Sequence, residues 1–288
     1  MSLSSNHKRL LIQASLIILV CACNYPLYPQ PLNVKIGPED DIAVVLDSLP
    51  PEIPLPENPA LPNDGLIILE SDRDGNREIY SLNSDGTNPV NLSRNPGEDW
   101  MIECSPDGQW VLFASVNENT LDIYLMDIWG IEKNLLFTLP GQEVVGIWVD
   151  PGVIFLDVYN NSNSTTYRLS HEEGLWEIGE APTDSLEGLV SKYCNFEDVI
   201  LETRIENYGE KDLDFEIFLI EGIEEKNLTN HPAWDMLPMW SADGSKILFT
   251  SDRYLEKSNL FLMDREGNIL QQITQNDAEN IAYCWIQN

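Results

Sequence analysis

The sequence predicts an all-β domain built from one structural unit that is repeated five times. From residue 66 onward, short stretches of alternating apolar residues are separated by Gly, Pro, Asn and Asp, which is typical of strands joined by tight turns. The pattern returns about every 45 residues, and this period with four short strands per unit is typical of propeller blades. We therefore predict a β-propeller of five four-stranded blades, with six blades as the alternative.

Three positions of the repeat can be followed through all five copies. The second strand carries Tyr80, Tyr124, Tyr167, Phe218 and Phe261. The third strand carries Leu92, Leu136, Ile178, Leu228 and Ile273. The innermost strand ends in Cys104, Trp148, Cys194, Trp240 and Trp285, which are 44, 46, 46 and 45 residues apart. Agreement of three positions over five copies is stronger evidence for a repeat than a single motif that could arise by chance.

The first copy shows how the strands are delimited. Residues 66–110 contain four stretches of strand pattern, which we interpret as an antiparallel meander. The turn Ser105-Pro106-Asp107-Gly108 closes the fourth stretch. Gly accepts a positive φ without Cβ strain, and Asp bonds its own backbone, so both residue types suit this turn.

These repeats carry a family resemblance. The stretches SDRDGNREIYSLNSDGTNPVNLS (71–93), CSPDGQWVLFAS (104–115) and NLFLMDREGNILQQIT (259–274) resemble the repeat of the TolB-type propeller, a relative of the WD-repeat. The resemblance spans about residues 65–288 and is weaker in the second and third copies. The second copy has Val149-Asp150-Pro151-Gly152 at the turn, and the third has Asn195-Phe196-Glu197-Asp198, which has lost both Pro and Gly. It implies a non-catalytic propeller that acts as an interaction platform in the periplasm, and the best-known relatives have six blades.

Residues 1–22 are predicted to be a signal peptide. Lys8 and Arg9 precede an apolar run over residues 10–20, which is too short to span a bilayer as a helix. The run ends in Val-Cys-Ala-Cys and resembles the processing box of bacterial lipoproteins, with Cys23 as the lipidated first residue and Cys21 as a weaker candidate. An ordinary cleaved signal or an uncleaved anchor is the alternative. We expect an exported protein of a bacterial cell envelope, anchored in a membrane through lipid.

Residues 23–64 are predicted to be a tether. Ten of the 18 prolines lie between residues 24 and 64. Proline has no backbone N–H to donate to a neighbouring strand, and a proline-rich segment favours an extended chain. At roughly 3.1 Å per residue, the tether can hold the domain up to ~100 Å from its anchor. Residues 65–288 then suit a single domain.

The two ends of the propeller are predicted to share one blade. The repeat begins at the second strand of a blade, and the chain ends with a first strand over residues 283–286. This last strand can pair with the strand that includes Ile67, which removes a free sheet edge that would invite aggregation.

The composition is strongly acidic. There are 48 acidic and 16 basic residues, and the formal net charge is −32. Such a surface is repelled by phosphates, so nucleic-acid binding is excluded. The charge favours either simple solubility or a basic or cationic partner.

The cysteines outside the signal region are predicted to be unpaired. Cys104 and Cys194 occupy equivalent positions two blades apart, and Cys284 lies one residue off that register, so its side chain should point the opposite way. Because the Cα atoms of a disulfide are rarely more than 7 Å apart, we expect small buried hydrophobic residues instead.

Acidic residues recur at one position of the repeat, five residues before the Trp or Cys. They are Asp99, Glu143 and Asp235, while Leu189 and Asn280 stand at the other two copies with Glu187 and Glu279 nearby. This position begins each inner strand, on the face that we call the top; the Ser-Pro-Asp-Gly turns lie on the bottom face. The acids are therefore candidates for a binding ring at the top mouth of the channel. The alternative is that each Asp only caps a turn.

A calcium site is a weaker hypothesis. Asp72, Asp74, Asn76 and Glu78 place oxygens at alternate positions, as calcium loops do, but the late bidentate Glu of an EF-hand is missing. A plain turn explains the stretch as well, so no cofactor is expected.

Catalysis finds little support in the sequence. There is no Gly-x-Ser-x-Gly or His-Glu-x-x-His motif, and His171 and His231 fall on opposite faces.

Exposed tryptophans could instead stack on sugars, and the candidates are Trp100, Trp129, Trp176 and Trp234. The leading hypothesis is a non-catalytic platform that binds an envelope or extracellular protein or peptide. The alternative is a carbohydrate-binding propeller at the cell surface.

Overall fold

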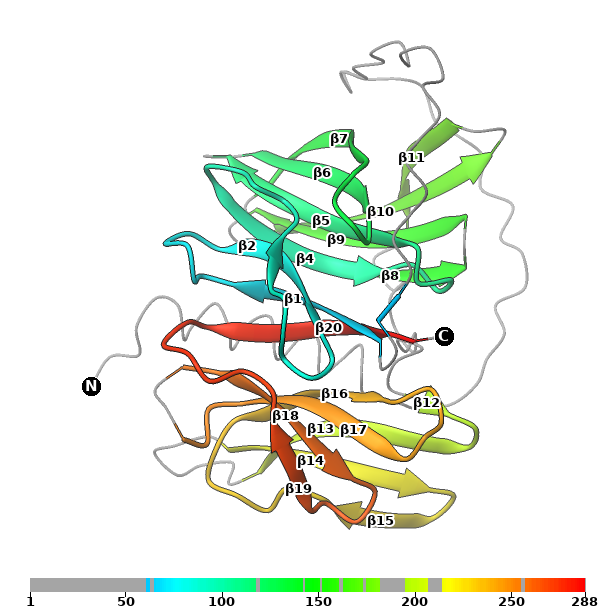
Figure 1. Cartoon of the computed structure of the whole chain (residues 1–288). Helices are drawn as coiled ribbons and strands as arrows, with labels where there is room; N and C mark the ends of the chain where they lie inside the picture. Colours follow the sequence, from blue (N-terminus) through cyan, green and yellow to red (C-terminus); the bar gives the residue numbers. More distant parts are fainter. Residues whose placement is uncertain are drawn as a thin grey trace.

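Figure 1 shows the computed structural model of the chain. It describes residues 61–62, 65–117, 120–141, 143–150, 152–160, 163–172, 175–181, 195–206, 214–254 and 257–287. The proposed signal peptide, almost all of the tether, Cys23 and Glu187 lie outside the described residues. No helix in the described part of the chain is long and apolar enough to cross a membrane.

The described strands form five four-stranded antiparallel sheets, which confirms the prediction of five blades. Blade 1 comprises β20 (Asn280–Ile286), β1 (Leu66–Ser71), β2 (Glu78–Asn83) and β3 (Val90–Asn91). Blade 2 comprises β4 (Glu98–Cys104), β5 (Trp110–Asn117), β6 (Thr120–Asp127) and β7 (Lys133–Pro140). Blade 3 comprises β8 (Glu143–Asp150), β9 (Val153–Asn160), β10 (Asn163–Glu172) and β11 (Leu175–Ala181). Blade 4 comprises β12 (Asn195–Phe196), β13 (Val199–Glu206), β14 (Asp214–Glu221) and β15 (Glu224–Asn227). Blade 5 comprises β16 (Asp235–Trp240), β17 (Lys246–Ser251), β18 (Asn259–Asp264) and β19 (Ile269–Gln272).

Blade 1 joins the two ends of the domain, as predicted. The C-terminal strand β20 pairs antiparallel with β1, from Leu66 opposite Ile286 to Ser71 opposite Asn280. Figure 1 shows the red β20 beside the blue β1, with blade 2 on one side and blade 5 on the other. The interpretation of residues 66–110 as a single meander is wrong in one respect. β4 pairs with β5, not with β3, and so begins blade 2.

The Ser-Pro-Asp-Gly turn takes the expected form. Gly108 has a φ of 68°, and the Ser105 hydroxyl accepts a hydrogen bond from the backbone N–H of Trp110 at 2.9 Å. Blade 5 repeats the geometry at Gly244, where φ is 65° and an added Cβ would lie 2.3 Å from the ring of Phe196. A glycine is therefore required there by both conformation and space.

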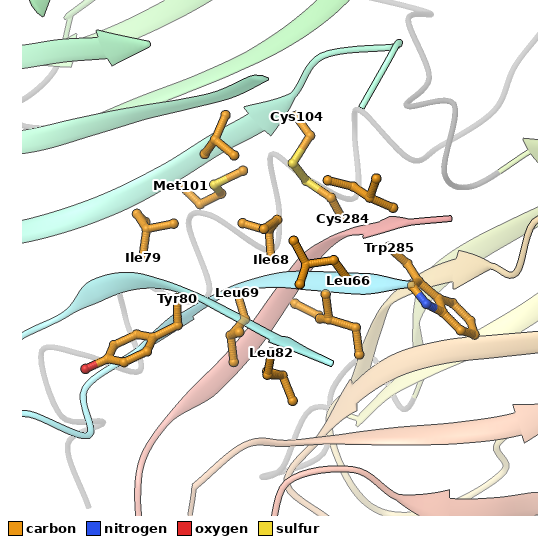
Figure 2. Close-up of a cluster of buried hydrophobic side chains, with 14 of the residues drawn as sticks. Leu66, Ile68, Leu69, Ile79, Tyr80, Leu82, Met101, Cys104, Cys284 and Trp285 are labelled. Carbon is orange, nitrogen blue, oxygen red and sulfur yellow. A yellow bond between two sulfur atoms is a disulfide. The ribbon is translucent and has the colours of Figure 1, made fainter. Parts of the chain in front are cut away.

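The apolar core contains a disulfide, so the prediction of unpaired cysteines is wrong for Cys104 and Cys284. Cys104 and Cys284 form a disulfide between β4 of blade 2 and β20 of blade 1, with Cα atoms 6.2 Å apart (Figure 2). The opposite orientation of Cys284 was interpreted as evidence against pairing, but it is what permits pairing. Neighbouring blades pack face to face, so side chains that leave their own sheets in opposite directions meet between the two sheets. Tyr283 forms a bulge opposite the step from Ile68 to Leu69, next to this cysteine.

Candidate functional site

The inner strands begin at the top face, where sequence analysis places the acidic ring. Asp99 is the second residue of β4, Glu143 begins β8, and Asp235 begins β16. Asn280 begins β20, and Glu279 precedes it. The repeat register was therefore correct, but the surroundings of these side chains differ from one blade to another.

Asp99 is fully buried in a network of polar side chains. Its two carboxylate oxygens accept hydrogen bonds from the Asn95 amide at 3.0 and 2.9 Å. Lys133 in turn donates to the Asn95 side-chain oxygen at 2.9 Å. Burial raises the pKa of Asp99, and hydrogen bonds from Asn95, Ser115 and Ser93 oppose that rise. This carboxylate thus orders the entry to β4.

Asp235 is also fully buried and is paired with an arginine. Arg253 donates to its Oδ2 at 2.8 Å, and the two side chains are 6% and 0% exposed for arginine and aspartate, respectively. The guanidinium lies over the rings of Phe249 and Phe261. Neither Asp99 nor Asp235 faces solvent. Contrary to the expectation from the sequence, these two acids are therefore not available to a partner at the top mouth.

Two of the predicted acids remain partly exposed. Glu143 and Glu279 are both of intermediate exposure. Glu279 also belongs to the contact between blades 5 and 1, because its backbone N–H donates to Asp72 Oδ1 at 2.7 Å. Its carboxylate accepts a hydrogen bond of 3.3 Å from the backbone N–H of Ser258. The ring is therefore only partly available to a ligand.

Sequence analysis missed a buried ion pair beside this mouth. Glu70 of β1 accepts hydrogen bonds from Arg77 at 2.5 Å and from the backbone N–H of Met101 in blade 2 at 2.6 Å. Burial raises the pKa of Glu70, whereas Arg77 acts to lower it. The sequence does show an acidic residue, Glu70, near the end of the apolar run Leu66–Ser71. The alternation of apolar and polar residues does not show which side chain pairs with it.

The oxygens of the calcium candidate are engaged by protein donors. Asp72 accepts from Lys257 at 2.6 Å, and Asp74 accepts from the hydroxyl of Tyr80. The Asn76 amide donates to Glu78 at 3.0 Å and to the Gly97 carbonyl at 2.6 Å. Among the described residues, no group of three or more His, Cys, Asp or Glu is arranged to hold a metal ion. The stretch fits the plain-turn alternative.

The candidate sugar-stacking tryptophans are all half-buried. Arg77 lies over the ring of Trp100 at 4.2 Å, Trp176 packs edge-on to Trp148, and Trp234 packs edge-on to Phe215. Trp129 packs against the core formed by blades 1, 2 and 5. A sugar ring would have to compete with Arg77 for the face of Trp100 that the guanidinium covers.

Comparison with known proteins supports the resemblance to the TolB-type β-propeller. No protein-family model matches the chain. The Tol-Pal system protein TolB of Desulfosudis oleivorans is 31% identical over 90 residues, which are 31% of this chain and 20% of the relative. TolB from Acinetobacter baumannii has a TM-score of 0.41 at 16% identity, over 74% of this chain and 54% of that structure. Kuenenia stuttgartiensis hydrazine synthase has a TM-score of 0.49 at 11% identity, over 79% and 48%.

Proposed function

We propose that this chain is a non-catalytic, lipid-anchored propeller of a bacterial cell envelope that binds a protein or peptide partner without a cofactor. The observation that carries the proposal is the sequence match over 90 residues to TolB, a Tol-Pal system protein, within a domain of five four-stranded blades. The match covers one fifth of that relative, so the nature of the partner has to be argued from this chain itself.

The charge of the chain favours a basic partner. Acidic residues outnumber basic ones by 48 to 16, and the charge repels anionic lipid and nucleic acid. Complementary charge across an interface chiefly raises the rate of encounter and selects among partners. We therefore place a basic protein segment, and not a phosphate-bearing ligand, at the interface.

The disulfide supports export. Structural disulfides form and persist in oxidising compartments and are rare in the cytosol. Cys104 and Cys284 are both buried, at 1% and 0% exposure, and are joined across two blades. This agrees with a signal peptide at residues 1–22.

Capture of a partner tests the proposed binding role. The mature chain, residues 23–288, should retain a protein with a basic surface from envelope extract, and the retained amount should fall as salt rises, because screening weakens exposed charge pairs. Retention would be measured by crosslinking and mass spectrometry between about 50 and 500 mM salt, a range over which the Debye length falls from about 14 Å to about 4 Å.

The same chain on a glycan array addresses the carbohydrate alternative. Specific sugar binding that Trp100→Ala abolishes, together with no protein capture, would contradict the proposed role. A thermal melt of the Trp100→Ala protein is the control, because a variant that unfolds would lose sugar binding for another reason.

Lipidation is tested at Cys23. Cys23→Ser should leave an unprocessed or soluble precursor, because the serine hydroxyl cannot carry the thioether-linked lipid. Fractionation and intact mass would measure this, with Cys21→Ser as the control that keeps processing. A Cys23→Ser protein that loses its signal and still sediments with membranes would refute the lipoprotein assignment.

A further inference from the structure

Two adjoining hollows lie on the bottom face, where the inner strands end. The first has a volume of about 210 Å³ and is lined by residues from blades 1, 2, 4 and 5, among them Gly108, Phe196, Trp240 and Ile286. The second has a volume of about 330 Å³ and lies between blades 5 and 1. They share Ser241, Ala242, Trp285 and Gln287, so they form one depression that runs outward from the end of the channel. We call it the bottom groove.

The edge of the bottom groove is acidic. It carries Asp107, Asp85 and Asp243, and Lys246 is the single basic residue among the described residues that line it. Hydrogen bonds from Ser241 and Ser245 lower the pKa of Asp243 to about 2, and hydrogen bonds from Thr87 lower the pKa of Asp85. Both carboxylates are therefore ionised throughout the neutral range.

The first hollow of the bottom groove has apolar and aromatic walls. Trp240 and Trp285 are 5% and 7% exposed, and their indole N–H groups find no acceptor among the described residues. The amide nitrogen of Gln287 is likewise without a partner in this part of the chain. Buried donors without acceptors are rare in native proteins. A ligand that brings carbonyl groups against these rings can supply acceptors.

The walls of the groove are held in place before any ligand binds. Gln287 accepts a hydrogen bond from the backbone N–H of Ala242 at 2.8 Å, which ties the end of β20 to the turn after β16. The close approach of Gly244 to Phe196 ties the same turn to blade 4. A preformed site loses less free energy to ordering when it binds.

The shape, the acidic edge and the aromatic walls together define the ligand. Each hollow lies at or below the low end of the volumes that hold a whole small molecule, and the two in series suit successive side chains of one segment. We propose that the bottom groove binds an extended peptide segment in which lysine or arginine alternates with aliphatic residues. The proposal rests on the proposed protein-binding function and places the contact on the bottom face instead of the top mouth.

Calorimetric titration with a designed probe tests the assignment. The probe is the blocked hexapeptide Gly-Leu-Lys-Leu-Lys-Gly, and the same peptide with glutamate in place of lysine is its control. Ala242→Arg places a bulky positive charge at an exposed position in both hollows. We expect it to weaken binding of the lysine peptide by about tenfold or more, which is 1.4 kcal/mol.

Ile223→Arg is the matched variant. It adds the same charge at a side chain that is 99% exposed, between β14 and β15, outside the groove. We expect it to change binding by no more than about twofold, because isolated exposed charges contribute little. The glutamate peptide should not bind either protein.

Three results would overturn the assignment. One is an equal loss in both arginine variants, which would show an effect of total charge. Another is no binding of the lysine peptide to the parent chain. The third is binding that survives Ala242→Arg but is lost in Glu143→Gln/Glu279→Gln, which would move the site to the top mouth. Capture of a basic envelope protein would still support the proposed function in each case, so the two can fail separately.

Discussion

Deletion of residues 281–288 should abolish the native fold instead of fraying one end of the chain. The deletion removes nearly all of β20, whose side chains Ile281, Ala282, Cys284, Trp285 and Ile286 are buried. Truncating one large buried apolar side chain costs about 2–5 kcal/mol, whereas a whole domain is stable by about 5–15 kcal/mol. The loss also leaves β1 with an unpaired edge. Circular dichroism and thermal melting of the truncated protein would measure the effect.

Cys284→Ala is the control that separates the strand from the disulfide. It removes the bond to Cys104 but keeps the pairing of β20 with β1. Loss of a native disulfide costs about 2–5 kcal/mol, so we expect a lower melting temperature with a single cooperative transition. A truncated protein that melts like the Cys284→Ala variant would show that β20 contributes only its cysteine.

Arg253→Met should destabilise the domain by about 3–5 kcal/mol. The substitution leaves the carboxylate of Asp235 buried with no counter-charge, and breaking a buried ion pair on one side has a cost of this size. The other carboxylate oxygen of Asp235 already lacks a hydrogen-bond partner among the described residues, so little compensation is at hand. Urea unfolding would measure the free energy.

Arg204→Met is the matched control. Arg204 also bonds carboxylates and lies over a ring, that of Phe218, but it is 27% exposed and its partner Glu225 is 51% exposed. An exposed pair contributes less than about 1 kcal/mol. The double variant Asp235→Asn/Arg253→Met should recover part of the loss, because no charge remains buried. Equal losses in Arg253→Met and Arg204→Met would show that the burial of Asp235 has no energetic consequence.

Much of the architecture follows from the sequence by itself. The repeat of Cys104, Trp148, Trp240 and Trp285 located the end of four inner strands, and the count of strands predicted that β20 completes blade 1. These inferences succeed because a strand has a period of two and a blade has a fixed length, so hydrogen-bonded neighbours within one sheet are encoded locally.

The side-chain contacts were decided by the tertiary structure. Repeat register shows that Asp99 and Asp235 are equivalent, but not that Asn95 encloses one and Arg253 pairs with the other. The same holds for Cys104 and Cys284, which are 180 residues apart in sequence and meet only because β4 and β20 face each other. Whether a carboxylate binds a ligand or is buried in the structure depends on the side chains that the fold places around it, here Asn95 from the loop before β4 and Arg253 from the loop after β17. The position of an acid in the repeat does not identify those side chains.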